Sequence, residues 1–173
     1  MSELIKSIFR EYDIRGVFPD ELNEDSIAQI AKSIAHKCYK ESVDEVVIAR
    51  DGRLSGPSLL ESLQESLNKY GINTINLGLA TSPLLYYAAK KQNSKSGIMI
   101  TGSHNPKNYN GIKLIIDDKP VSGIEIFELS KKDLYLENSN GENKFLDIKD
   151  EYITEVKSNF NFIKLKVVVD CGN

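Results

Sequence analysis

The sequence predicts an α/β fold: a three-layer α/β/α domain in which a mixed, mostly parallel sheet is flanked by helices. Two observations lead to this prediction. Short apolar runs that suit buried strands alternate with longer segments whose apolar residues recur at the spacing of one helix face. Polar, turn-forming residues follow three of these strands, and open parallel sheets bind their ligands beyond the carboxyl ends of the strands.

The chain begins with a predicted edge strand over residues 9–18, FREYDIRGVF, in which charged residues interrupt the aromatic ones. The charges fit a strand whose side chains are solvated at the edge of a sheet. Arg15, beside Gly16, also fits a guanidinium that reaches a bound anion, because its planar fork matches phosphate oxygens. This stretch taken alone favours the solvated edge strand.

Helices and strands then alternate. Asn23 is placed to cap a helix whose apolar residues recur at the spacing of one buried face. These residues are Ile27, Ile30, Ala31, Ile34, Ala35 and Cys38. His36 lies off this face, so we expect it in solvent. The next predicted elements are a strand over 45–49, a helix capped by Ser55 that stops at Gly71, a strand over 72–79 and a helix from 81.

The second half of the chain opens with a polar loop between two apolar runs. Residues 98–100 suit a strand that is buried on both faces, residues 101–106 are turn-forming and reactive, and residues 112–116 return as a strand. The short connection favours antiparallel pairing of these two strands, which makes the sheet mixed. The last predicted elements are a helix over 124–137, a short strand over 145–148, a helix over 149–160 and a strand over 163–170.

The order of the last elements predicts two domains. A strong strand is followed only by Cys171, Gly172 and Asn173, which is an unusual way to end a domain. We therefore expect residues 1–148 to form a first domain and residues 149–173 to be the truncated beginning of a second.

Composition excludes several classes of function. The chain has 173 residues, is 40% hydrophobic and carries a net charge of −3, with its basic residues dispersed. Nothing in this pattern indicates a nucleic-acid or membrane partner. Cys38 and Cys171 make no metal-binding spacing, and Cys38 is expected to be a buried, reduced thiol. The N-terminus lacks a secretory pattern, so we expect a cytoplasmic protein.

The segment Arg50-Asp51-Gly52-Arg53 lies between a predicted strand and the start of a helix. A helix N-terminus flanked by two arginines can hold an anion. The same residues can equally form a self-satisfied cluster that braces the loop, and the sequence leaves both interpretations open. Residues 81–82 and 101–106 also follow predicted strands, so we expect all three segments to meet in one site.

The loop at 101–106 carries the most reactive side chains. Ser103 follows a glycine and can act as a nucleophile or a phosphate carrier, while His104 can exchange a proton or form a hydrogen bond. Backbone N–H groups around Gly102 can form an anion nest, and Lys113 on the next strand can neutralise a phosphate. The alternative is an ordinary Asn-Pro turn in which Ser103 and His104 are satisfied locally. Signatures of hydrolase triads and P-loops are missing.

Four motifs resemble, in order, those of the α-D-phosphohexomutase family of the phosphomannomutase/phosphoglucomutase type. They are FREYDIRG at 9–16, RDGRLSG at 50–56, TSP at 81–83, and TGSHNP at 101–106 with YNGIK at 109–113. Residues 167–173 resemble the opening strand of the family's second domain. The resemblance implies a four-domain phosphotransferase of which this chain supplies the phosphoserine domain, with the rest of domain 2 and domains 3 and 4 missing.

The resemblance also implies roles for individual residues. The serine matching Ser103 carries a phosphoryl group, gives it to a hexose phosphate and recovers the other phosphoryl group of the resulting bisphosphate. Lys113 is the implied general acid/base and phosphate-stabilising group. Tyr12, Arg15 and His104 are expected beside the phosphoserine and the substrate, which makes Ser103, His104, Lys113 and Arg15 the candidate catalytic residues. Tyr12, Arg15 and Lys113 are the candidate substrate-binding residues.

The implied cofactor is Mg²⁺, which would bind the phosphate of Ser103. The family's Asp-Gly-Asp-Gly-Asp-Arg metal loop is absent here, and one oxygen ligand does not hold Mg²⁺ tightly. We therefore expect this chain alone to be inactive. Mannose and glucose 1- or 6-phosphate are the implied substrates, without a preference between them. The alternatives are a phosphoglucosamine mutase domain and a non-catalytic sugar-phosphate-binding domain.

Overall fold

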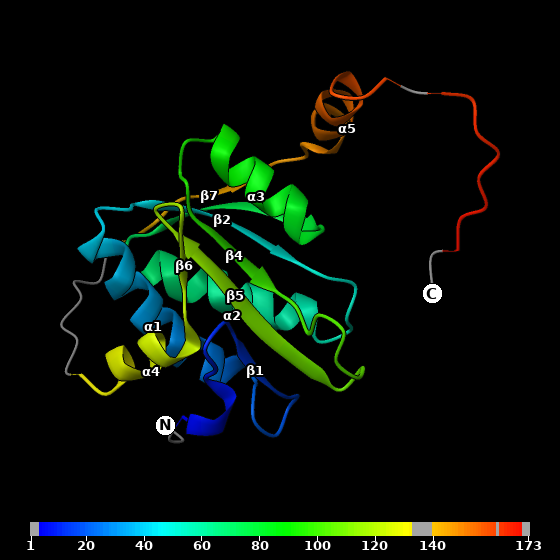
Figure 1. Cartoon of the computed structure of the whole chain (residues 1–173). Coiled ribbons are helices and arrows are strands. Elements are labelled where there is room, and N and C mark those ends of the chain that lie inside the picture. Colours follow the sequence, from blue (N-terminus) through cyan, green and yellow to red (C-terminus); the bar gives the residue numbers. More distant parts are fainter. Residues whose placement is uncertain (1–3, 133–139, 162, 171–173) are drawn as a thin grey trace.

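The computed structural model describes residues 4–132, 140–161 and 163–170, so the predictions for 133–137 and for Cys171 to Asn173 lie outside the described residues. A 7-stranded sheet with the order β1-β5-β4-β2-β3-β7 forms the centre, and β6 pairs with β5 (Figure 1). Its strands are β1 (Ile14–Val17), β2 (Glu45–Arg50), β3 (Asn73–Leu79), β4 (Gly97–Ile100), β5 (Tyr109–Ile116), β6 (Lys119–Val121) and β7 (Asn143–Phe145).

Strand directions confirm the mixed, mostly parallel sheet. β4, β2, β3 and β7 pair in parallel, and β5 runs antiparallel to β4 as the short connection predicted. β1 and β6 both pair antiparallel with β5, so they point the same way as β4. Among the described strands, β5 alone therefore runs against the others.

Helices cover both faces of this sheet, which confirms the three layers. α1 (Glu24–Lys40), α2 (Gly56–Lys69) and α4 (Gly123–Ser130) lie on one side, and α3 (Ser82–Lys91) lies on the other with α5 (Lys149–Ser158) beside it (Figure 1). A hydrophobic core lies on each face of the sheet, and alternate residues of β2 point into one or the other. Val46 and Ile48 pack with α1 and α2, whereas Val47 and Ala49 pack with α3.

α1 forms where its apolar spacing and cap predicted. Asn23 and Ser26 make a reciprocal capping box, in which the Asn23 side chain accepts from the Ser26 backbone and the Ser26 hydroxyl accepts from the Asn23 backbone. Cys38 is buried, and burial raises the pKa of its thiol to about 12, so it stays protonated as expected.

His36 is half-buried on α1, which corrects the prediction of a solvated histidine. Burial lowers its pKa, helped by the nearby charges of Lys40 and Lys132. A histidine with a lowered folded pKa binds fewer protons than in the unfolded chain, so its contribution to stability is lost as the pH falls through its unfolded value of about 6.5.

We expect His36→Gln to flatten the decline in thermal stability between pH 7 and pH 5, because the replacement does not titrate. Denaturation curves followed by circular dichroism at several pH values measure this. Lys69→Gln, an exposed change on α2, serves as the control and should leave the decline as in the parent chain.

The N-terminal segment is less regular than the strand predicted over 9–18. A 3₁₀ turn over Lys6–Ile8 is followed by a single bridge between Phe9 and Ile14, and only Ile14–Val17 pairs with β5. β1 lies at one end of the sheet order, as an edge strand should. Tyr12 precedes it and is 85% exposed.

The C-terminal elements differ most from the prediction. α4 ends at Ser130, and β7 lies two residues earlier than expected. α5 has no buried residue, but Lys91 forms an ion pair with Glu155, and Tyr87 donates to the same carboxylate. The strand predicted over residues 163–170 does not form, and Val168 within this segment is 91% exposed. A strand needs a partner strand for its backbone hydrogen bonds.

Over the described residues, no helix is long and apolar enough to traverse a bilayer.

Candidate active site

The carboxyl ends of the parallel strands meet at one edge of the sheet, as predicted. Arg50 at the end of β2 is in register with Ile100 of β4 and with Leu79 of β3. The segments that follow these three residues therefore emerge side by side. Because β5 runs the other way, its first residues reach the same edge, with Ile112 opposite Ile100.

Ser103 lies at the surface of the connection between β4 and β5, residues 101–108, which we call the Ser103 loop. Its side chain is exposed and its backbone adopts a left-handed conformation with φ of 53°. Its Oγ lies 3.4 Å from Nδ1 of His104, which is also exposed. A serine held in this uncommon conformation at a strand end is typical of a functional position.

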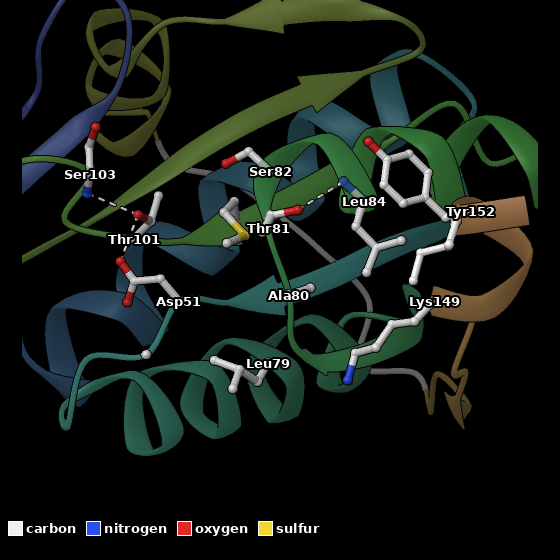
Figure 2. Close-up of a pocket in the computed structure, with 13 residues that line it drawn as sticks. Asp51, Leu79, Ala80, Thr81, Ser82, Leu84, Thr101, Ser103, Lys149 and Tyr152 are labelled. Carbon is white, nitrogen blue, oxygen red and sulfur yellow. Dashed lines mark hydrogen bonds between the residues drawn. The ribbon is translucent and has the colours of Figure 1, made fainter. Parts of the chain in front are cut away.

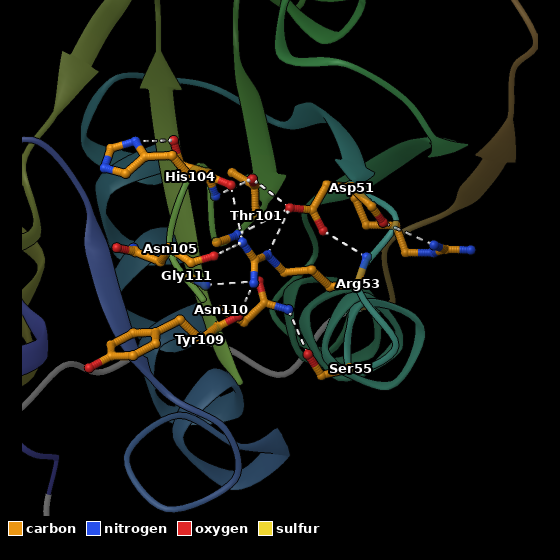
Figure 3. Close-up of polar contacts among 12 residues, drawn as sticks. Asp51, Arg53, Ser55, Thr101, His104, Asn105, Tyr109, Asn110 and Gly111 are labelled. Atoms are coloured by element: carbon orange, nitrogen blue, oxygen red, sulfur yellow. Dashed lines mark hydrogen bonds and ion pairs between the residues drawn. The ribbon is translucent and has the colours of Figure 1, made fainter. Parts of the chain in front are cut away.

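Asp51 holds the start of the Ser103 loop (Figure 3). Its Oδ2 accepts from the Thr101 hydroxyl at 2.8 Å and from the Gly102 backbone at 3.2 Å. Thr101 Oγ1 in turn accepts from the Ser103 backbone at 2.9 Å. The N–H group of Gly102 is thus bound by Asp51 and that of Ser103 by Thr101, so the predicted anion nest around Gly102 is wrong for these two groups.

Arg53 holds the rest of the Ser103 loop. Its guanidinium donates to four backbone carbonyls of the loop and of the first residue of β5, and its Nε donates to Asp51 (Figure 3). Arg50 instead donates to the carbonyl of Asp51. Of the two interpretations that the sequence left open, the structure therefore favours the braced loop over the anion site.

The two helices that begin near the site start differently. Thr81, where a helix was predicted to begin, caps α3, and its hydroxyl accepts from the Leu84 backbone. Ser55 occupies the N-cap position of α2 but makes no capping bond with its side chain. Its Oγ accepts from the amide of Asn110 at 2.9 Å instead, and this buried asparagine also accepts from the Gly111 backbone.

Arg15 and Lys113 lie on the same face of the sheet, close to the Ser103 loop along the strands. Arg15 is opposite Gly111, which accepts from the Thr101 backbone, and Lys113 is opposite Met99. Arg15 donates to Asp13 through Nε at 2.9 Å and Nη2 at 2.6 Å, so a buried carboxylate fixes its guanidinium. Lys113 is half-buried. Tyr12 precedes β1 and is exposed, and its role in binding stays a prediction.

A groove of about 680 Å³ adjoins Ser103 (Figure 2). Asp51, Thr101 and Ser103 line one side of it, and Lys149 and Tyr152 of α5 line the other. Thr81 and Ser82 from the start of α3 lie between them, so the three segments predicted to share a site do share one.

The residues present do not by themselves fit a Mg²⁺ site. Mg²⁺ prefers several oxygen ligands in octahedral geometry. Across residues 4–132, 140–161 and 163–170, no group of three or more His, Cys, Asp or Glu side chains is placed to hold a metal ion. Asp51, the carboxylate that binds the start of the Ser103 loop, already accepts four hydrogen bonds.

Sequence reasoning missed the contacts that shape the loop. The carbonyl acceptors of Arg53 lie 50 to 56 residues further along the chain, and Asn110 lies 55 residues from Ser55. Only the polar segment 50–53 at a strand end signalled that these residues mattered.

Fold and site together define a class of protein: a three-layer α/β/α domain that presents an exposed serine on a braced loop at the carboxyl edge of its sheet. Residues 6–130 match the model of the phosphoglucomutase/phosphomannomutase α/β/α domain I. This match covers more than half of the chain, so the chain belongs to the phosphoglucomutase/phosphomannomutase family.

Relatives and solved structures agree with this assignment. The chain is 41% identical over 170 residues to a phosphomannomutase/phosphoglucomutase of Pseudomonas syringae and 34% identical to a phosphoglucomutase of Neisseria meningitidis. Its fold matches a family member from Burkholderia thailandensis with a TM-score of 0.86 and 32% identity over 94% of this chain. The chain spans 37% and 39% of the two curated relatives, and 38% of the Burkholderia chain.

Proposed function

We propose that this chain is the phosphoserine-bearing first domain of a hexose-phosphate mutase, with Ser103 as the phosphoryl carrier. The observation that supports the proposal most directly is that Ser103 is exposed while its backbone N–H and carbonyl are both held by hydrogen bonds. The carrier must be accessible and yet fixed, because positioning and charge neutralisation provide most of the catalysis in phosphoryl transfer.

The proposed transfer begins with phosphorylated Ser103. The bond between Oγ and phosphorus breaks while a hydroxyl oxygen of the hexose phosphate bonds to phosphorus. The hydroxyl proton passes to Nζ of Lys113, and His104, whose Nδ1 is 3.4 Å from Oγ, returns a proton to the serine. The sugar bisphosphate then reorients in the site, and the same steps in reverse return its other phosphoryl group to Ser103. Arg15 and Tyr12 are the proposed contacts to the substrate phosphate and sugar.

The proposed substrates are mannose and glucose 1- and 6-phosphates, since the names of several relatives refer to both sugars. A relative at 36% identity is named a probable phosphoglucosamine mutase, so glucosamine phosphate is the second candidate. We further propose that residues 149–173 lead into a second domain and that the enzyme is cytoplasmic. Mg²⁺ would take one ligand from the phosphate of Ser103 and the others from residues beyond this chain.

Intact-protein mass spectrometry and turnover assays of the full-length protein test the proposal. We expect the mass of one phosphate group on a fraction of the freshly purified protein, absent in Ser103→Ala and retained in Ser7→Ala, which changes an exposed serine in the 3₁₀ turn. We also expect conversion of the sugar 1-phosphates with Mg²⁺ present. A full-length protein that turns over none of the three sugar phosphates would contradict the proposal, as would turnover by the present chain alone.

Lys113 offers a separate test of the acid/base role. We expect Lys113→Met to lower kcat of the full-length enzyme by about 10²–10³-fold, because the proton acceptor is lost. Arginine is always protonated and cannot accept the hydroxyl proton, so Lys113→Arg should stay nearly as slow. Lys90→Met, an exposed change on α3, is the control. Full activity of Lys113→Arg would assign Lys113 to charge neutralisation alone.

A further inference from the structure

Arg53 stands out because every N–H of its guanidinium is already used. Nη1 donates to the carbonyls of Pro106 at 2.6 Å and Tyr109 at 3.0 Å. Nη2 donates to those of Ser103 at 3.0 Å and Asn105 at 2.7 Å. Nε donates to Asp51 at 3.3 Å. A guanidinium has five N–H groups, so none remains for a phosphate or a sugar.

This inference rests on the proposed function. We propose that Arg53 is a positioning residue for phosphoryl transfer: it holds the Ser103 loop through its backbone carbonyls and does not contact the transferred group. The side chain is 13% exposed and lies against Gly102, where an added Cβ would come within 2.3 Å of its Cζ. Gly102 is therefore the residue that lets the guanidinium reach the carbonyls.

Hydrogen bonds that lead back to Arg53 and Asp51 hold both backbone groups of Ser103, its carbonyl and its N–H. The carbonyl of Ser103 is bound by Arg53, and its N–H is bound by Thr101, whose hydroxyl is bound by Asp51. A serine with φ of 53° does not keep that conformation without outside restraint. Both restraints come from the segment after β2, so the direction in which Oγ points is set by residues about 50 positions earlier in the chain.

The proposal predicts a particular kinetic signature. Because Arg53 has no donor left for substrate, its loss should not weaken sugar-phosphate binding. The freed loop should instead misplace Oγ, and a misplacement of about 1 Å reduces the rate of transfer by about 10²-fold. We therefore expect Arg53→Gln to lower kcat by about 10²-fold and to leave KM within about threefold of the parent value.

Two further variants separate positioning from folding. Arg53→Lys retains the charge near Asp51 but cannot span four carbonyls, so it should also lose most of kcat. Gly102→Ala keeps the arginine, but the added Cβ would displace its guanidinium from the loop carbonyls. This variant should therefore show the same fall in kcat and unchanged KM as Arg53→Gln. Lys69→Gln, an exposed change on α2 away from the Ser103 loop, is the control and should retain kcat within about twofold.

All variants are made in the full-length enzyme and assayed with glucose 1-phosphate and Mg²⁺ after circular dichroism has checked the fold. A folded Arg53→Gln enzyme with kcat within threefold of the parent would overturn the proposal. So would a rise in KM that matches the fall in kcat/KM, since that pattern marks a binding residue. If none of the Arg53 and Gly102 variants folds, Arg53 is a stability determinant and the positioning role is rejected. Full activity of Ser103→Ala would instead reject the phosphoserine mechanism itself, so the two failures are distinguishable.

Discussion

Full-length enzyme with alanine in place of Ser103 is expected to lose at least about 10⁴-fold in kcat for glucose and mannose 1-phosphate. The residue supplies the only atom of the protein that bonds to the transferred phosphorus in the proposed mechanism, and loss of a covalent nucleophile leaves just the residual effect of binding. KM should change little, because the exposed Oγ is not needed to hold the rest of the sugar phosphate.

Ser103→Thr refines this experiment. Threonine keeps the hydroxyl, but a β-branched residue strongly disfavours a left-handed backbone such as the φ of 53° found here. We expect a phosphorylated but slow enzyme, between Ser103→Ala and the parent. Steady-state kinetics combined with intact mass measure both properties. Parent-like activity of Ser103→Ala would contradict the carrier role, and parent-like activity of Ser103→Thr would show that the backbone conformation is unimportant.

Gly111→Ala is expected to have the largest effect on stability. A Cβ at this position would lie 2.2 Å from the carbonyl oxygen of Ile14 and 3.3 Å from Cγ of Arg15. Backbone cannot yield as a flexible side chain does, so β1 would have to separate from β5. Overpacking of this kind costs about 2–3 kcal/mol, which corresponds to a fall of roughly 5–10 °C in Tm for a chain of this length.

The matched control is Gly52→Ala, because a Cβ at Gly52 would meet nothing within 4 Å. Thermal denaturation of both variants should show a change within about 0.5 kcal/mol for Gly52→Ala and the large loss for Gly111→Ala. The displaced β1 also carries Arg15, so activity of the full-length Gly111→Ala enzyme should fall with its stability. Equal Tm values for the two variants would contradict the close approach of β1 and β5.

The features that could be predicted from the sequence are those that depend on neighbouring residues. The apolar spacing after Asn23 predicted α1 and its cap because residues three and four apart share one helix face. The short connection between β4 and β5 predicted their antiparallel pairing for a similar reason. The convergence of residues 51, 81 and 101 followed from the geometry of parallel strands.

Interactions between distant residues could not be predicted in the same way. The side chain of Ser55 had a local cap available, yet it bonds Asn110, and Arg53 bonds carbonyls that carry no sequence signature at all. The segment 163–170 shows the converse. Its apolar residues have strand propensity, but they form no strand, because among the described residues no strand of the sheet lies in register with them.

The reversed strand β5 has a consequence for how the molecule is assembled during synthesis. Because β4 and β5 are joined by a short hairpin connection, the Ser103 loop is closed by residues that follow one another closely in the chain. Its outside restraints, Asp51 and Arg53, precede it. The candidate residues from Tyr12 to Lys113 are therefore all translated before α4, and domains fold from the N-terminus as they emerge. The Ser103 loop and its restraints can thus form during synthesis before α4 is made.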